Sequence, residues 1–89
     1  MYTIVLITTK GCIGCNVMRS AIREAINTSN LDISFTVKDI KELSGAYKAT
    51  HKLRDFPTTQ FFVDNRKVRQ EIGSRPSIVV KHWIKLDFK

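Results

Sequence analysis

The sequence has few of the residues that mark secreted scaffolds, linkers and membrane proteins. Its 89 residues include two cysteines, two prolines and four glycines, too few for a disulfide-stabilised secreted domain or a low-complexity linker. No apolar run approaches the ~20 residues that span a bilayer, and no cleavable signal pattern opens the chain. We therefore expect a single cytoplasmic domain over residues 1–89, without a membrane partner.

The sequence is also short of acidic residues. Fifteen lysines and arginines face eight aspartates and glutamates, which gives a formal net charge of +7 and a pI near 9.8. An excess of this size suggests an acidic partner or a nucleic acid. The cations, however, are spread from Lys10 to Lys89 without a block of five or six. We expect a solvated basic surface, with attraction to an acidic protein as the alternative, and no nucleic-acid partner.

A buried strand that leads into a C-x-x-C motif organises the chain. The apolar run Ile4–Ile7 ends in a short polar turn, and Cys12 and Cys15 follow where a helical pattern over 13–27 begins. The start of a helix favours an anion, so we expect the pKa of the Cys12 thiol to fall below the ~8.5 of a free cysteine. Cys15 lies within one helical turn, close enough for a reversible disulfide.

The same spacing also occurs in metal sites. Structural zinc needs four ligands, and this chain has no third cysteine. Its two histidines, His51 and His82, are far apart and do not form an H-x₃₋₅-H pair. We predict no metal site within one chain. A dimer that shares a metal or iron–sulfur cluster through Cys12 and Cys15 stays open as an alternative.

Apolar periodicity predicts the remaining elements. Alternation is typical of strands and a recurrence every three or four residues is typical of helices. In the last strand, alternation puts Val68, Gln70 and Ile72 on one face. The order β-α-β-α-β-β-α predicts an α/β domain with a four-stranded mixed sheet flanked by three helices. The expected strands are 2–8, 31–38, 58–63 and 67–72, and the second and third helices lie near 40–53 and 76–86.

Local signals set the ends of the later helices. Asp39, with Glu42 three residues on, forms a capping-box pattern for the second helix. Gly45 weakens that helix by about 1 kcal/mol relative to alanine, so we expect it to be short or irregular. Pro76 suits the first turn of the closing helix, with Ser74 as its cap.

Several of these features together resemble the thioredoxin superfamily, and in particular its small glutaredoxin-like members. They are the strand, the C-x-x-C motif at a helix start, the turn Phe56–Pro57–Thr58 into a strand, the hairpin, Gly73 and the closing helix. The Phe56–Pro57 bond is a candidate for the cis form. The resemblance covers nearly the whole chain and implies a thioredoxin-like fold.

The resemblance also implies a function and a site. Cys12 is the implied nucleophile, Cys15 the resolving thiol, and Pro57 the cis-proline that faces the sulfurs. The implied activity is an electron-transport enzyme, a thiol–disulfide oxidoreductase that reduces protein disulfides as a monomer. A ribonucleotide reductase is a candidate substrate, and a reductase or thiol pool would restore the dithiol. The implied substrate-binding residues are Phe56, Pro57, Thr58, Lys10, Gly11, Ile13 and Gly73.

The chain departs from the family pattern at four places. Ile13–Gly14 replaces the Gly-Pro or Pro-Tyr between the cysteines, which leaves the reduction potential open. Gly11 stands where a tryptophan precedes the motif, and Leu6 or a neighbour where thioredoxins bury an acid. The stretch 73–77 lacks the aspartate that holds the glutathione amine, which disfavours glutathione, although Lys10 could still bind its carboxylate. We expect no cofactor besides the redox-active disulfide.

One further alternative is a protein with the same fold but without disulfide-exchange activity. The chain could be a non-catalytic accessory subunit that docks its basic surface on an acidic partner. A variant with both Cys12 and Cys15 replaced by serine separates the two hypotheses, because an accessory subunit would keep its full function.

Overall fold

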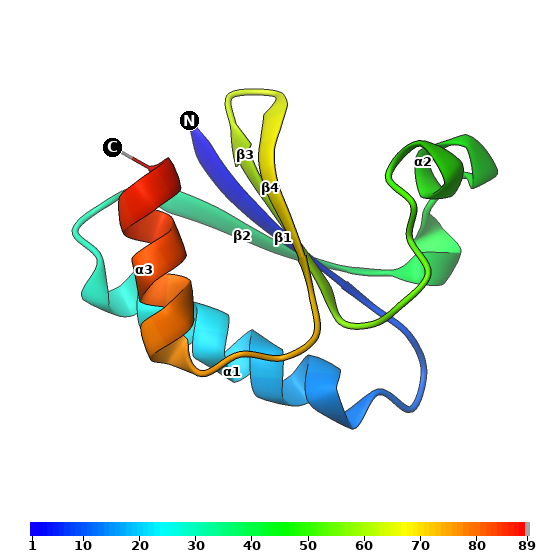
Figure 1. Ribbon diagram of the computed structural model, residues 1–89, viewed down its shortest axis with the longest axis horizontal. Helices are drawn as coiled ribbons and strands as arrows, with labels where there is room; N and C mark the ends of the chain where they lie inside the picture. Colours follow the sequence, from blue (N-terminus) through cyan, green and yellow to red (C-terminus); the bar gives the residue numbers. More distant parts are fainter. Residues whose placement is uncertain (89) are drawn as a thin grey trace.

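The computed structural model describes residues 1–88, and its elements follow the predicted β-α-β-α-β-β-α order (Figure 1). The four strands form one sheet in the order β2-β1-β3-β4. Strand β1 pairs parallel with β2 and antiparallel with β3, and β3 pairs antiparallel with β4. The elements are β1 Tyr2–Thr8, α1 Ile13–Thr28, β2 Ile33–Asp39, the 3-10 helix η1 Ile40–Glu42, α2 Gly45–Thr50, β3 Thr58–Val63, β4 Arg66–Ile72 and α3 Ser77–Asp87.

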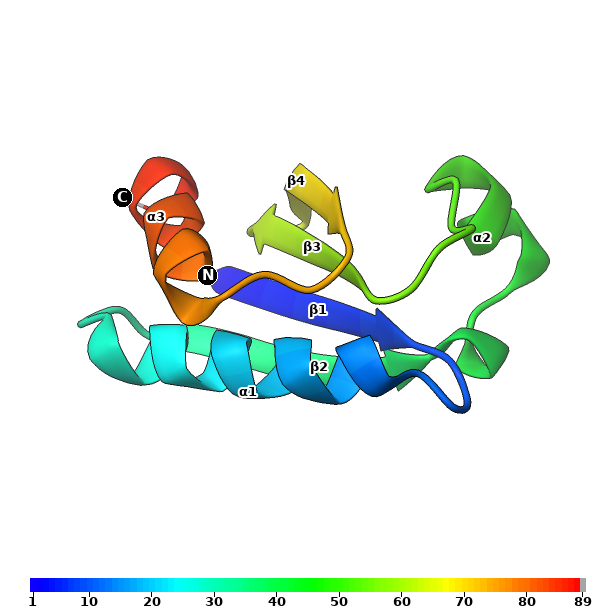
Figure 2. The same cartoon turned by 60° about the horizontal axis from the view of Figure 1, so that its bottom comes forward.

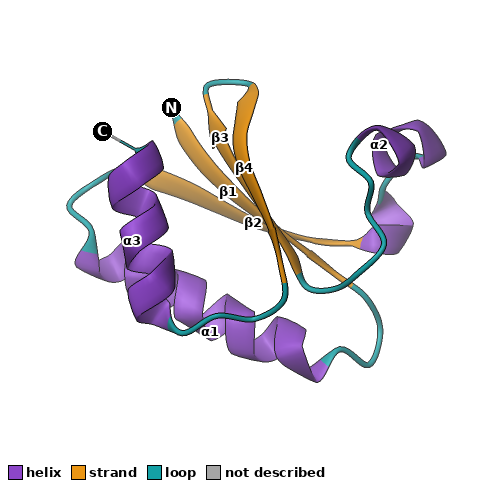
Figure 3. Ribbon diagram, viewed as in Figure 1, coloured by secondary structure: helices purple, strands orange, loops and turns teal. Residues whose placement is uncertain are grey.

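Helices α1 and α3 pack on one face of the sheet and enclose the core (Figures 2 and 3). Side chains from paired positions of β1 and β3, such as Ile4 and Phe61, point into this layer and are fully buried. Burial of such apolar side chains supplies most of the favourable free energy of folding. The core residues are Ile4, Leu6, Met18, Ala21, Ile22, Ala25, Phe61, Val80, Trp83, Ile84 and Phe88. Within residues 1–88, no helix has the length and apolar character needed to cross a bilayer.

A polar network joins α2 to the other face of the sheet. The Tyr47 hydroxyl donates to Gln60 at 2.9 Å, and the Gln60 amide donates to Gln70 at 3.0 Å. Lys67 Nζ lies 2.8 Å from Gln70 and 2.9 Å from His51 Nδ1. Burial first, and then the charge of Lys67, hold the pKa of His51 below 6.5. These bonds satisfy buried polar groups and fix the short helix on the sheet.

A β-bulge brings Lys67 into this network. The register passes from the pair Phe61–Arg69 to the pair Phe62–Lys67 and leaves Val68 without a partner. An extra residue of this kind reverses the alternation of the strand beyond it. Lys67 therefore shares a face with Gln70, and the predicted grouping of Val68 with Gln70 is wrong.

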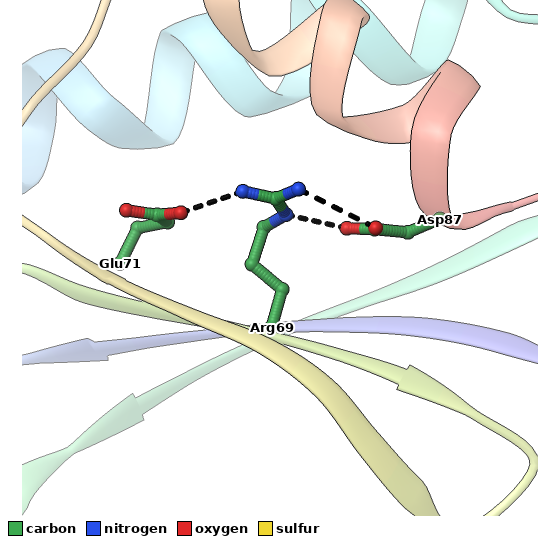
Figure 4. A network of polar contacts seen from close by, with 3 residues as sticks. All are labelled: Arg69, Glu71 and Asp87. Atoms are coloured by element: carbon green, nitrogen blue, oxygen red, sulfur yellow. Dashed lines mark hydrogen bonds and ion pairs between the residues drawn. The ribbon is translucent and has the colours of Figure 1, made fainter.

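Arg69 ties β4 to the end of α3 (Figure 4). Its Nε donates to Asp87 at 2.5 Å, and one Nη donates to Glu71 at 2.6 Å. The guanidinium also lies over the Trp83 ring, 5.4 Å from the ring centre. The hydrogen bond to Asp87 is the main reason that the pKa of Arg69 is raised. Two carboxylates and an aromatic face thus compensate this charge.

The structure corrects three local predictions. Strand β2 begins at Ile33 rather than Leu31, because the Leu31 amide donates to the Ser29 hydroxyl in the preceding loop. The second helix is short and interrupted, as predicted, but Gly45 begins α2 instead of weakening its interior. The Asp39–Glu42 capping box is confirmed on η1.

The third correction concerns the start of α3. Pro76 occupies the N-cap position and no side chain caps the helix. Ser74 lies too early in the chain for that role, and its side chain approaches the start of α1 at Gly14 instead. The position of Pro76 outside the helix follows from its extended ψ of 157°.

Candidate functional site

The C-x-x-C motif lies where the chain leaves the central strand β1 and begins α1. Gly11 has φ +76°, a conformation that glycine adopts without strain, and this turn delivers Cys12 to the N-cap of α1. Cys12 and Cys15 form a disulfide with their Cα atoms 5.3 Å apart. Cys12 Sγ also accepts a hydrogen bond from the Cys15 amide at 3.1 Å. The sulfur takes the place that a serine or aspartate oxygen fills at other helix starts.

The two sulfur-bearing residues differ in exposure. Cys15 is 3% exposed, whereas Cys12 is only partly buried. Ile13, between them, is 82% exposed and projects an apolar side chain beside the disulfide. An incoming group therefore reaches Cys12 first and meets Ile13 as it does so.

Pro57 lies against the same turn of α1. The Phe56–Pro57 bond is cis, and a Cβ added to Gly14 would lie 3.5 Å from Pro57 Cδ. The Pro57 carbonyl accepts a hydrogen bond from the Gly73 amide at 2.8 Å, and Gly73 has φ +93°. The loop before β3 and the loop after β4 thus meet at the helix start, next to the disulfide.

The other predicted site residues take different positions around this centre. Gly11 lines the hollow beside the disulfide, and Phe56 is partly buried next to Pro57. Thr58 is 1% exposed and its hydroxyl donates to the Asp55 carbonyl at 2.6 Å. Lys10 is exposed in the loop before Cys12. Contact of these residues with a substrate stays a prediction, and for Thr58 it would involve the backbone.

A hollow of about 290 Å³ opens beside the disulfide, and four of its lining residues were not predicted for the site, namely Thr8, Thr9, Asn16 and Arg19. A signal for Arg19 was present, since it follows Cys15 by four residues and so lies on the same side of the helix. The lining residues are Thr8, Thr9, Gly11, Cys12, Ile13, Cys15, Asn16 and Arg19.

The neighbourhood of the cysteines offers no further ligands for a metal within one chain. Among residues 1–88, no three His, Cys, Asp or Glu side chains lie close enough together to hold an ion. Leu6, in the strand that precedes the cysteines, is fully buried in the apolar core. The disulfide is therefore the reactive group that this arrangement offers.

Solved structures share the arrangement of these elements. A malarial protein superposes with a TM-score of 0.81 at 11% identity, over 100% of this chain and 99% of that chain. Thioredoxin-2, a component of the malaria parasite protein secretion machinery, superposes with a TM-score of 0.81 at 12% identity, over 97% of this chain and 82% of its own. The fold is thioredoxin-like. No protein-family model and no curated protein sequence matches the chain.

The thioredoxin-like fold gives the Cys12–Cys15 pair a chemical context. The pair lies at C-x-x-C spacing, closes a disulfide and begins a helix that follows the central strand. A reversible disulfide at such a position fits a thiol oxidoreductase.

Proposed function

We propose that the chain is a protein-disulfide reductase that works by dithiol–disulfide exchange. One observation carries the proposal: the Cys12–Cys15 disulfide is held at the start of α1 with Pro57 against the same turn. The more exposed Cys12 is the attacking sulfur, and the buried Cys15 is the resolving one. Helix amides and the Cys15 N–H favour a thiolate at Cys12.

The exchange proceeds in two balanced steps. The Cys12 thiolate attacks one sulfur of the substrate disulfide, forms a mixed disulfide and releases the other substrate sulfur as a thiolate. The Cys15 thiolate then attacks Cys12 Sγ, which breaks the mixed disulfide and releases the second substrate thiolate. Two electrons pass to the substrate, and the Cys12–Cys15 disulfide of the present structure is the product. Protons lost by the two cysteines return to the substrate thiols through solvent.

The surface around Cys12 supports a protein substrate. Ile13, beside Cys12, is 82% exposed, and Ile72, the β4 partner of Thr58 after the cis-proline, is 45% exposed. Apolar side chains of this kind bind extended polypeptide better than a small polar thiol. The stretch 73–77, where the family carries its glutathione-binding aspartate, contains no acid in this chain. A reductase or thiol pool, rather than a bound cofactor, would restore the dithiol. A ribonucleotide reductase is one substrate of this kind.

A trapping experiment tests the proposal. The Cys15→Ser variant, incubated with a disulfide-bonded protein such as insulin, is expected to accumulate a mixed disulfide on Cys12 that mass spectrometry can locate. The matched Cys12→Ser variant should trap nothing. Absence of any adduct on Cys12, together with no reduction of insulin by the dithiol protein, would contradict the proposal. Full cellular function in the double serine variant would instead identify an accessory subunit.

A further inference from the structure

Arg19 is a cation beside the disulfide without an anionic partner. It is partly buried, its Nε is shielded from solvent, and no residue of 1–88 forms a hydrogen bond or ion pair with its guanidinium. It lines the same hollow as Cys12 and Cys15, and no acidic residue of the described chain lines that hollow. A guanidinium that gives up water without gaining a carboxylate is an open site for an anion.

Arg75 is a second cation near the site that has no carboxylate partner in residues 1–88, and its guanidinium lies next to Gly73. Its backbone amide contacts Met18 Sδ at 3.3 Å, which places it over α1. Its guanidinium donates to the Ser74 carbonyl at 3.1 Å and has no carboxylate partner within residues 1–88. Ser74 itself lies beside Gly14, between the cysteines. Two arginines without carboxylate partners in residues 1–88 therefore lie near the disulfide: Arg19 lines the hollow beside it, and Arg75 lies next to the Gly73 loop.

The segments that build the site contain no acid to offset these charges. Residues 1–23, 56–63 and 73–86 lack aspartate and glutamate altogether. The first acid of the chain, Glu24, already accepts a hydrogen bond from Ser77 and pairs with Lys81 at 3.8 Å. Asp55 precedes Phe56, and Asp39 is the last residue of β2, where its carboxylate caps η1. These segments therefore bring cations to the neighbourhood of Cys12 and no acidic residue.

We propose that the preferred substrate is a protein disulfide flanked by acidic residues, whose carboxylates Arg19 and Arg75 bind. This inference rests on the proposed function and names the substrate class for it. A carboxylate beside the substrate cysteine accepts charge-assisted hydrogen bonds from a guanidinium that is already partly desolvated. These cations also steer such a substrate to Cys12 and raise its association rate.

The test compares three disulfides with the reduced protein. Two are peptides of equal length and the same central disulfide, one flanked by aspartates and one by lysines, and the third is the uncharged 2-hydroxyethyl disulfide. At low ionic strength we expect the acidic peptide to react about tenfold or more faster than the basic one. In ~1 M salt, where the Debye length is ~3 Å, the ratio should fall to within about threefold.

Charge-neutral variants assign the effect to the two arginines. Arg19→Gln and Arg75→Gln should each lower the acidic-to-basic ratio by about threefold, since each removes one cation of the site. Any change in Cys12 reactivity or in folding affects both peptides equally and cancels in the ratio. Lys85→Gln removes the same charge from an exposed position in the last turn of α3 and should leave the ratio unchanged.

The outcomes distinguish failure of the substrate inference from failure of the proposed function. Equal rates for the two peptides, or a ratio that Lys85→Gln lowers as much as the two arginine variants do, would overturn the inference and leave the proposed function intact if 2-hydroxyethyl disulfide is reduced. No reaction with any of the three disulfides would overturn the proposed function, and the substrate inference with it.

Discussion

The arginine near the end of α3 and the two arginines near the disulfide differ in their carboxylate partners. At the end of α3, Arg69 has two carboxylates around it (Figure 4), and its guanidinium lies over the Trp83 ring. At the start of α1, Arg19 and Arg75 have no carboxylate within residues 1–88. All three are partly buried. The charge of Arg69 is therefore used to hold the fold together, whereas the other two charges are left available beside the disulfide.

The difference separates an arginine that stabilises the fold from arginines that are available to bind a substrate. Removal of one partner from a partly buried ion pair is destabilising because it leaves the other charge uncompensated. The partners of Arg69, Asp87 and Glu71, come from α3 and β4. A cation without such partners contributes little to stability and can serve an external anion. Four predictions test this contrast, from the largest expected effect to the smallest.

Removal of the attacking sulfur should have the largest effect, and it should act on chemistry alone. In Cys12→Ser, exchange with a protein disulfide should be lost entirely, because a serine hydroxyl does not form the mixed disulfide. The free energy of unfolding of the reduced protein should stay within ~0.5 kcal/mol, since a serine oxygen also caps a helix. Steady-state insulin reduction and urea denaturation measure the two quantities, and residual reduction would assign the attack to Cys15.

Removal of one carboxylate from Arg69 should act on stability alone. Asp87→Asn keeps the size of the side chain but removes the charge that accepts the 2.5 Å hydrogen bond. We expect the free energy of unfolding to fall by about 1–2 kcal/mol, with unchanged disulfide exchange at a temperature where the variant is folded. Urea denaturation measures the loss. A fall in exchange rate without loss of stability would break the contrast between Arg69 and the arginines near the disulfide.

The network under α2 should make stability depend on pH. Because burial and then Lys67 lower the pKa of His51, the unfolded chain binds a proton near pH 6.5 that the folded chain does not bind until lower pH. Stability should therefore be full above about pH 6.5 and decline as the pH falls below it. His51→Gln should flatten this part of the profile measured by thermal denaturation at several pH values. The exposed His82→Gln serves as control, and an equal flattening there would refute the assignment.

The smallest effect should come from Arg19 on stability. Arg19→Met keeps the length of the side chain and removes a cation that has no partner in residues 1–88. We expect the free energy of unfolding to stay within ~0.5 kcal/mol of the wild-type value or to rise. A loss as large as that of Asp87→Asn would mean that Arg19 has a structural role and that the contrast with Arg69 does not hold.

The sequence predicted the elements that carry strong local signals. Strand β1 and helix α1 follow from an apolar run and a helical stripe, and the capping box of Asp39 and Glu42 depends on residues three apart. Ser74 was misplaced as a cap because cap residues are common in turns, and its actual neighbour, Gly14, lies about 60 positions away in the sequence. Contacts between residues so far apart in the sequence produce no periodic pattern from which they could be predicted.

The candidate site was predictable in its chemistry and less so in its surroundings. The C-x-x-C spacing pointed to a disulfide, and Pro57 preceded a strand in a familiar turn, so both could be named in advance. Arg19 and Arg75 looked like two among fifteen dispersed cations. Only the folded chain brings Arg19 into the hollow beside Cys12 and Arg75 next to Gly73, without a carboxylate partner for either in residues 1–88.

The ionisation of Cys12 in the reduced protein tests the central claim most directly. The absorbance of the thiolate, followed across pH in wild type and in Cys15→Ser, gives the titration midpoint of that single sulfur. We predict that the pKa of Cys12 lies well below the ~8.5 of a free cysteine, because the start of α1 and the Cys15 amide stabilise the anion. A midpoint at or above ~8.5 would mean that the helix start does not activate this sulfur, and the account would be wrong.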